Sequence, residues 1–239
     1  MIKLLDYNDR ALIEHNKSRG ASALRIKALF KTYGIGRSFI SFFADETGDV
    51  LICVQDNFAV VYIKDESHVD EVSQFLAFTV NSILSEFPLK LSGYKVEIGN
   101  TYALYKWEPV LLEGVSNELQ TGYNLLSKVF TGSINSTTYK RWYTDLSHRI
   151  RHDMSKIYTY QGACSATTYL MDDGTIIVAQ LATIEQERGK GLAQKMLYHI
   201  ASQTPNTREI MLLSQDKTSD KFYEKIGCTL LDKWYCYVR

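Results

Sequence analysis

The sequence lacks an excess of either charge and lacks any paired-cysteine motif. Lysine plus arginine and aspartate plus glutamate both total 27, so the formal net charge is zero. A protein that binds duplex DNA normally carries surplus basic residues to neutralise phosphates, and we therefore expect no nucleic acid partner. The cysteines form no C-x-x-C pair and no zinc-ligand spacing, which predicts free thiols in a reducing compartment and no bound metal. They are Cys53, Cys164, Cys228 and Cys236.

Long apolar runs are also absent. Residues 1–6 do not have the apolar stretch of a signal peptide, and no segment approaches the ~20 uncharged apolar residues of a membrane span. Apolar residues nevertheless make up 45% of the chain, which is enough for a sizeable core. With 239 residues, the chain has room for one large domain or two small ones. We expect a cytoplasmic protein without a membrane partner.

Strand-like and helix-like apolar patterns alternate along the chain. In the first half they predict helices within 8–33, broken at Gly20, strands at 38–44, 50–54, 58–63, 91–98 and 102–107, and a long helix at 67–87. In the second half they predict helices at 118–130, 137–152, 192–202 and 219–226, and strands at 156–160, 166–171, 176–184, 209–213 and 234–238. This alternation indicates an α/β or α+β fold, in which a mixed sheet is layered with helices.

Residues 109–114 interrupt the strand pattern before a new helical series begins, which indicates a domain boundary. The sequence therefore predicts domains at 1–109 and 110–239. Both halves show the same order of helices, antiparallel strands, and then a strand that leads into a longer helix. This shared order favours an ancient duplication.

The segment 179–193 carries the clearest chemical signal. An apolar strand ends, Gly189 and Gly191 follow, and an amphipathic helix begins at once. The first N–H groups of a helix lack partners within it, and the helix dipole places partial positive charge there. Glycines let phosphates approach the backbone, while Arg188 and Lys190 add full positive charges. The pattern predicts a site for a diphosphate.

Other phosphate motifs fit this segment poorly. The G-x-x-x-x-G-K-[ST] pattern of nucleoside-triphosphate sites is absent, and a dinucleotide fingerprint would need glycine where Gln194 stands. The alternative is a strand-to-helix turn in which the two glycines only permit tight packing, because a lone Gly-x-Gly is a weak motif.

Two segments carry a family resemblance. Residues 186–193 (QERGKGLA) resemble the Q/R-x-x-G-x-G/A motif of the GNAT acyltransferases, and residues 216–228 resemble that family's N-x-x-A-x-x-x-Y-E-K-x-G-F segment. The resemblance covers about 156–239. It implies the GNAT fold, acetyl-CoA as co-substrate and no metal. With the duplicated order, it implies two tandem GNAT-like domains, of which the second alone carries the coenzyme A motif and the first is degenerate.

The resemblance also implies roles for individual residues. Its fourth and fifth strands separate, so that backbone groups around Leu181 and Thr183 bind pantetheine and the amides that follow bind the diphosphate. Tyr223 is placed near the leaving sulfur, where a phenol can donate a proton; simple packing of its helix is the alternative. The implied cofactor-binding residues are Leu181, Ala182, Thr183, Arg188, Gly189, Lys190, Gly191, Leu192, Ala193, Asp216 and Ser219.

The sequence departs from the family pattern at several positions. Asp216, Ser219 and Cys228 replace the usual Asn, Ala and Phe. Histone-acetyltransferase relatives carry a glutamate base on the fourth strand, and counting back from the phosphate turn places Thr175 there. That base is therefore missing.

No other base follows from the residues. His148 and His152 lie four apart on one helix face, which suits a base or a metal pair, but solvated positions are the alternative and no third ligand is evident. Loss of the amine proton through ordered water would need no base.

The first half shows the opposite chemistry at the matching helix start. Asp65, Glu66, Asp70 and Glu71 surround it without a glycine, so they would repel a diphosphate. The sequence therefore predicts one coenzyme A site per chain.

Three functions remain open from the sequence. We expect an N-acetyltransferase that acts on a small-molecule or peptide amine, in a monomer or homodimer. The alternatives are a coenzyme A-binding sensor or scaffold without turnover, and a nucleotide-binding module that uses the same helix start.

Overall fold

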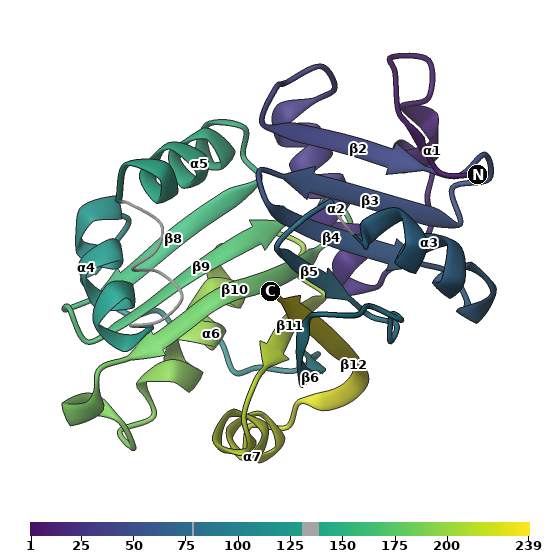
Figure 1. Cartoon of the computed structure of the whole chain (residues 1–239). Helices are drawn as coiled ribbons and strands as arrows, with labels where there is room; N and C mark the ends of the chain where they lie inside the picture. Colours follow the sequence, from purple (N-terminus) through teal and green to yellow (C-terminus); the bar gives the residue numbers. More distant parts are fainter. Residues whose placement is uncertain (78, 131–138) are drawn as a thin grey trace. The chain divides into compact units, whose positions relative to one another are not determined.

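The computed structural model describes residues 1–77, 79–130 and 139–239. The chain forms two compact units, which do not coincide with the two halves of the sequence (Figure 1). Unit 1 contains Met1–Thr101, Ser214–Lys221 and Leu230–Arg239, and unit 2 contains Tyr102–Leu213 and Phe222–Thr229. The division into domains at 1–109 and 110–239 stays a prediction.

Unit 1 is a mixed sheet with helices on both faces. Its strands follow the order β1-β2-β3-β4-β5-β12-β6; β4 and β5 are parallel, whereas β1–β2, β2–β3, β3–β4 and β5–β12 are antiparallel pairs. The elements are β1 (Lys3–Leu4), α1 (Ala11–Glu14), α2 (Ala21–Tyr33), β2 (Ile40–Ala44), β3 (Val50–Gln55), β4 (Phe58–Ile63), the 3-10 helix η1 (Glu66–His68), α3 (Val69–Leu76), β5 (Ser82–Ser85), most of β6 (Lys95–Leu104) and most of β12 (Thr229–Val238).

Two adjacent phenylalanines show how the unit 1 sheet is layered. Successive side chains of a strand point to opposite faces. Accordingly, the Phe42 ring packs on Phe30 of α2 with centroids 5.4 Å apart, and the Phe43 ring packs on Phe75 of α3 at 5.1 Å. The sheet thus needs apolar residues on both faces, which explains the nearly continuous apolar runs of β3 and β4.

The predicted helix at 67–87 is wrong over its second half. A 3-10 turn and α3 occupy its first part, α3 ends at Leu76, and residues 82–85 form strand β5; residue 78 lies outside the described residues. Ile83 is fully buried in a core cluster that also contains Val72 and Leu76 of α3 and Tyr237 of β12. A short helix followed by a buried central strand reproduces helical apolar spacing, which misled the sequence prediction. The two weak strands predicted at 91–98 and 102–107 likewise form one strand, β6.

The last strand of the chain completes the unit 1 sheet. β12 pairs with β5 in antiparallel register, with Tyr235 opposite Ser85 and Val238 opposite Ser82. The Tyr237 hydroxyl also accepts a hydrogen bond from the Leu89 amide at 2.6 Å. Unit 1 is therefore incomplete without residues from the far end of the sequence.

Unit 2 also combines a mixed set of strands with helices. Its strands follow the order β11-β10-β9-β8-β7, in which β10 and β11 are parallel and the other pairs antiparallel. The elements are β7 (Val115–Ser116), α4 (Leu119–Val129), α5 (Tyr139–Arg151), β8 (Ser155–Tyr160), β9 (Cys164–Leu170), β10 (Thr175–Thr183), the 3-10 helix η2 (Glu185–Glu187), α6 (Leu192–Gln203) and β11 (Glu209–Ser214); helix α7 (Lys217–Lys225) begins in unit 1 and ends in unit 2.

Helices α4 and α6 cover opposite faces of the unit 2 sheet. Ile157 of β8 fills the space beside Gly122 of α4, where a side chain would collide with it. The next residue, Tyr158, contacts His199 of α6, with ring centroids 6.0 Å apart. The predicted helices at 118–130 and 192–202 are confirmed within two residues at each end. The helix predicted at 137–152 is described from Tyr139; its first two positions lie outside the described residues.

Helix α5 is held on the sheet by a buried arginine. The Arg149 guanidinium donates to Asp145 at 2.7 Å and to the Ser155 hydroxyl at 3.0 Å, and it stacks 4.5 Å from the Tyr169 ring centroid. Only 7% of Arg149 is exposed. A buried guanidinium needs such partners, so this cluster fixes the position of α5 relative to β8 and β9.

Candidate functional site

Strands β10 and β11 separate partway along their length. Their parallel pairing runs from Thr175 opposite Glu209 to Val178 opposite Leu212 and then stops. The register of β10 with β9 shifts between Val178 and Gln180, yet that pairing continues to Thr183. Within the described residues, the second half of β10 therefore keeps only β9 as a strand partner, and a strand edge of this kind can pair with an extended ligand. This is the separation that the resemblance implied.

The turn that follows β10 has a backbone that requires glycine. Gly191 is the N-cap of α6 with φ 75° and ψ 10°, and Gly189 has φ 78°. A Cβ at either position would meet no atom within 4 Å, so the left-handed conformation, and not crowding, selects glycine here. Among the described residues, no side chain caps α6. Gly191 is exposed, and the first amides of a helix have no acceptor within it, as an anion site needs.

The two cations of the turn contact acceptors within the turn itself. The Lys190 ammonium lies 2.8 Å from a Glu187 carboxylate oxygen, and the Arg188 side chain donates to the Thr183 carbonyl at 3.2 Å. The Arg188 amide donates to the Glu185 carbonyl at 3.2 Å. The Lys190 ammonium, the Arg188 side chain and the Arg188 amide, which are the predicted anion-binding groups named here, therefore already have partners with which an anion must compete. Arg188 and Lys190 are exposed, and such surface contacts contribute little free energy, so an anion can replace them.

The three predicted pantetheine-binding residues of β10 are not equivalent. Ala182 is 3% exposed and packs against Leu125 and Leu126 of α4, whereas Leu181 and Thr183 are partly exposed. Leu192 and Ala193, in the first turn of α6, are also partly exposed. Ala182 consequently contributes packing beneath the strand edge, and its neighbours lie where a ligand could reach them.

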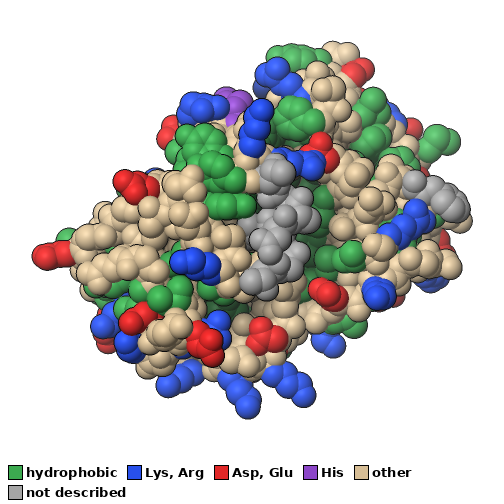
Figure 2. Space-filling model, turned by 60° about the vertical axis from the view of Figure 1, so that its left-hand side comes forward, with side chains coloured by type: hydrophobic (Ala, Val, Ile, Leu, Met, Phe, Trp, Pro, Cys, Tyr) green, Lys and Arg blue, Asp and Glu red, His purple; other side chains and the backbone are tan. Residues whose placement is uncertain are grey.

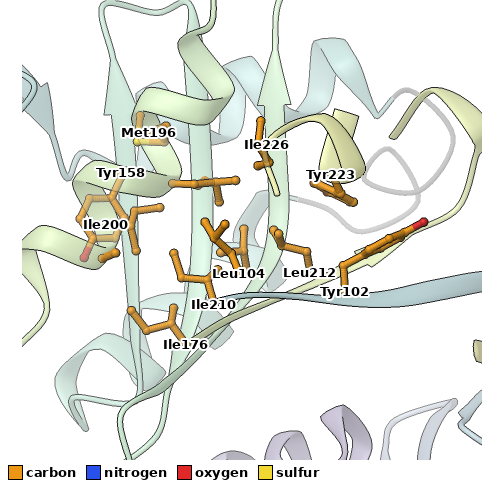
Figure 3. Packing of buried hydrophobic residues seen from close by; sticks show 14 of the residues in the cluster. Tyr102, Leu104, Tyr158, Ile176, Met196, Ile200, Ile210, Leu212, Tyr223 and Ile226 are labelled. Atoms are coloured by element: carbon orange, nitrogen blue, oxygen red, sulfur yellow. The ribbon is translucent and has the colours of Figure 1, made fainter. Parts of the chain in front are cut away.

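Tyr223 lies in the core of unit 2. Its ring stands 5.5 Å from the Tyr102 ring, measured between centroids, and the residue is 7% exposed. Figure 3 shows Tyr223 beside Tyr102, with Leu212 and Ile226 nearby. Leu212 is the last residue of β11 that pairs with β10, so Tyr223 belongs to the same core cluster as the end of that pairing.

Asp216 and Ser219 form the N-terminal cap of α7. One Asp216 carboxylate oxygen accepts from the amides of Thr218 and Ser219 at 2.8 and 2.9 Å, and the other accepts from the Ser219 hydroxyl at 3.0 Å. The hydrogen bond from the Ser219 amide is the main cause of a lowered Asp216 pKa, and burial opposes it. Both residues belong to unit 1, whereas the phosphate turn belongs to unit 2.

Thr175, which stands where histone-acetyltransferase relatives carry a glutamate base, takes part in a buried hydrogen bond. Thr175 is fully buried, and its hydroxyl donates to Glu209 at 2.9 Å. Sequence reasoning identified Thr175 but missed Glu209, which is 4% exposed. Only the parallel register of β10 with β11 places the two opposite each other. The sequence signal for Glu209 was that a carboxylate stands at the first position of the strand predicted at 209–213.

The two histidines of α5 stack on each other. The ring centroids of His148 and His152 lie 4.6 Å apart. Across residues 1–77, 79–130 and 139–239, no group of three or more His, Cys, Asp or Glu residues could hold a metal ion.

On the face drawn in Figure 2, basic and acidic side chains are interspersed. That distribution differs from the single-sign surface typical of duplex-binding proteins. Among the described helices, none has the length and apolar character needed to cross a membrane.

Comparison with known proteins identifies the fold. No protein-family model and no curated protein matches the sequence. Solved structures match over the whole chain. A tandem GNAT protein of clavulanic acid biosynthesis has a TM-score of 0.60 at 8% identity, covering 100% of this chain and 98% of its own. The chain has the tandem GNAT fold.

Two further structures give the same result. A GCN5-related N-acetyltransferase from Sphaerobacter thermophilus has a TM-score of 0.60 at 12% identity, with 100% of this chain and 95% of that chain covered. A Drosophila protein has a TM-score of 0.62 at 8% identity, with 100% and 98% covered. In the GNAT fold of this chain, β10 and β11 are the separating strands and α6 is the glycine-capped helix.

Proposed function

We propose that the protein is an N-acetyltransferase, which binds acetyl-CoA beside β10 and acetylates an amine. The observation that carries this proposal is the geometry at the end of β10. Pairing with β11 stops at Val178, the strand continues to Thr183, and a helix with a left-handed glycine cap follows. An unpaired strand edge that leads into free helix amides suits a ligand with an amide-bearing arm and a diphosphate.

The residues present fit that ligand. The edge of residues 179–183 that faces away from β9 would offer peptide groups to the pantetheine amides, and the exposed Gly189 and Gly191 would let the diphosphate approach the first amides of α6. Arg188 would exchange its carbonyl partner for a phosphate oxygen, which forms a stronger charge-assisted hydrogen bond, and Lys190 would exchange one anionic partner for another. Asp216 and Ser219 would act by holding the first turn of α7 in place.

Acetyl-CoA supplies an activated thioester: the amine nitrogen bonds to the acetyl carbon, the carbon–sulfur bond breaks, the amine loses a proton, and the thiolate gains one. Tyr223 would donate a hydrogen bond or a proton to that thiolate. The acceptor would be a small-molecule or peptide amine. Because Thr175 carries no carboxylate and lies fully buried, we assign it no role in removing the amine proton.

A second candidate function is a coenzyme A-binding sensor or scaffold without turnover. Two observations favour it: Tyr223 is packed in the core, and the usual base position holds Thr175 bonded to Glu209. Both candidates predict that acetyl-CoA binds, so binding alone does not separate them.

The deciding experiment incubates the intact protein with acetyl-CoA and a panel of amines, and follows free coenzyme A and acetylated amine by chromatography. A reaction without amine controls for hydrolysis, and the Gly191→Val variant controls for catalysis outside the proposed site. Amine-dependent coenzyme A release by the wild-type protein alone supports the enzyme. Tight binding without release for any amine supports the sensor, and absence of binding contradicts both.

A further inference from the structure

Gln180 is the first polar side chain of β10 beyond the end of its pairing with β11. That pairing stops at Val178. Residues 175–178 are buried, Ala179 is exposed, and Gln180 and Leu181 are partly exposed. Exposure thus begins where the two strands separate. A ligand that reaches this point of the strand edge would meet the Gln180 side chain.

A buried threonine holds the amide of Gln180. The Thr167 hydroxyl donates to the Gln180 side-chain oxygen at 3.0 Å, and Thr167 is the cross-strand partner of Gln180 on β9. Only 2% of Thr167 is exposed. A glutamine side chain has one accepting oxygen and an NH2 group with two donors. Among the residues that the structure describes, no acceptor bonds this NH2 group, so a fixed amide offers both donors to a ligand oxygen.

Gln180 lies on the sheet face opposite α6. Its hydrogen bond with Thr167 places both side chains on one face, and cross-strand partners share a face of a sheet. The partner of Thr167 on β8 is Ile157, which packs beside Gly122 of α4. Helix α6 covers the other face. The Gln180 amide therefore reaches the strand edge from the side of α4.

In the proposed acetyl-CoA site, the diphosphate end lies at Thr183 and the thioester end lies near Gln180. The Arg188 side chain donates to the Thr183 carbonyl, so the phosphate turn folds back against the last residue of β10. A pantetheine arm that starts at this turn and follows the strand edge would extend toward Val178, where β11 rejoins β10. Gln180 is three residues before Thr183, roughly 10 Å along a strand. The reactive end of the arm would therefore lie beside Gln180.

The Gln180 amide is uncharged, and its two donors suit an oxygen that accepts hydrogen bonds, such as that of a carbonyl or a carboxylate. Tyr223, the proposed donor to the leaving thiolate, belongs to the core cluster that includes the inner face of α6. A thioester at the end of the pairing would thus have Tyr223 on one face and Gln180 on the other. An amine attached to an alkyl group alone would displace water from the Gln180 donors without replacing its hydrogen bonds, which weakens binding.

We propose that Gln180 determines which amines are acetylated, by donating a hydrogen bond to an oxygen on the carbon next to the amine-bearing carbon, and that Thr167 positions it. The acceptor class is therefore an amine with a neighbouring carbonyl or carboxylate oxygen. This inference rests on the proposed acetyltransferase function and names the acceptor for the same site. Gln180 contacts the acceptor, whereas Thr167 acts only through the orientation of the Gln180 amide.

The test compares kcat/KM for two acceptors of the same shape, L-alaninamide and the 3-methylbutan-2-amine of matching configuration, in which an isopropyl group replaces the amide. Gln180→Met keeps the side-chain length and removes the donors, so it should lower the preference for L-alaninamide by about ten-fold. The different reactivities of the two amines cancel, because the same pair is compared in each protein. The control is Gln120→Met, since Gln120 is exposed on α4 and its side chain bonds Asn124 at 2.9 Å. It should leave the preference unchanged.

Thr167 provides a second arm. Thr167→Val should lower the same preference because it releases the Gln180 amide, whereas Thr167→Ser keeps a hydroxyl and should retain the preference. A loss of packing alone would change kcat/KM for both acceptors equally. L-Alanine distinguishes the two sources of the oxygen: it is a better acceptor than L-alaninamide if the site takes a carboxylate, and a poorer one if it takes an amide. Gln180→Glu should disfavour L-alanine more than L-alaninamide, because like charges then meet.

Calorimetry with acetyl-CoA separates this inference from the proposed function. Gln180→Met should bind acetyl-CoA as the wild type does. If the wild type acetylates amines but shows no preference for L-alaninamide or L-alanine, or if the preference is the same in Gln180→Met, the role of Gln180 is overturned and the acetyltransferase stands. If no amine elicits release of coenzyme A from the wild type, both proposals are overturned.

Discussion

The Thr175 hydroxyl donates a hydrogen bond to the Glu209 carboxylate, 2.9 Å away, at the first paired position of β10 and β11. Both residues are buried. The pair joins the two strands where their pairing begins, and the pairing ends at Val178 on the side of the proposed acetyl-CoA site. A buried carboxylate is strongly destabilising unless hydrogen bonds satisfy it. The Thr175 hydroxyl supplies one such bond to Glu209, so Thr175 stabilises β11 as well as β10.

We expect Thr175→Val to lower the free energy of unfolding by about 1–3 kcal/mol, because it removes a donor from a buried carboxylate while conserving volume. Thr167→Val is the matched control: Thr167 is equally buried, but its hydroxyl donates to the uncharged Gln180 side chain at 3.0 Å. Chemical denaturation should show the larger loss for Thr175→Val. Equal losses would show that the charge of Glu209 is not what matters.

Gly191→Val should weaken acetyl-CoA binding by at least about ten-fold, which corresponds to ~1.4 kcal/mol. A branched Cβ would stand in the open space beside the first amides of α6. Gly162→Val is the control, because Gly162 also has a positive φ, 65°, and open space around it, but lies in the turn between β8 and β9. Calorimetry on both variants makes the comparison. An unchanged affinity of folded Gly191→Val would remove this turn from the site.

Tyr223→Phe should preserve acetyl-CoA binding and lower kcat by about 10²-fold, near the lower end for general acids, because a thiolate leaves fairly easily. Tyr102→Phe is the control, since Tyr102 is the buried ring that contacts Tyr223. Steady-state kinetics with an amine found by the acceptor screen would measure both. If kcat falls equally in both variants or in neither, Tyr223 only packs the core.

Acetyl-CoA should bind with a stoichiometry of one per chain. In unit 1, the helix start that corresponds to α6 lies at η1 and α3, where Asp65 already caps the Ser67 amide at 3.0 Å and Asp70 and Glu71 follow. These carboxylates would repel a diphosphate. The titration must use the intact chain, because β12 belongs to the unit 1 sheet and a fragment of the first half would lack it. A stoichiometry near two, or residual saturable binding in Gly191→Val, would reveal a second site.

Asp216→Ala should lower the free energy of unfolding at neutral pH by about 1 kcal/mol, the usual effect of losing a helix N-cap. The Asp216 pKa is lowered in the folded state, so its stabilisation is complete above the ordinary aspartate pKa and disappears as the pH falls through the lowered value. The difference between the wild type and Asp216→Ala should therefore shrink below about pH 4. Asp216→Asn keeps the accepting oxygen without the charge, and its stability relative to Asp216→Ala should not depend on pH. Denaturation curves across this pH range would measure both differences.

Many local elements were predictable from the sequence. Strand β4 has the predicted bounds, and the turn at Gly189 and Gly191 was identified from residue types alone. Such features depend on backbone conformation and on neighbours a few residues away. A glycine directly before an amphipathic helix favours a left-handed turn in any fold, which is why the turn before α6 was predictable from residue types; its role in phosphate binding stays a prediction.

The tertiary structure decided what depends on distant residues. Strand β5 was mistaken for helix because its antiparallel partner, β12, lies at the far end of the sequence, and the Tyr237 hydroxyl accepts from the Leu89 amide across 148 positions. The Thr175–Glu209 bond likewise exists only because two strands pair in one register. Local patterns record how each segment prefers to fold. The partner of a strand is set by the free energy of burying apolar surface over the whole chain, and no short window of sequence contains that information.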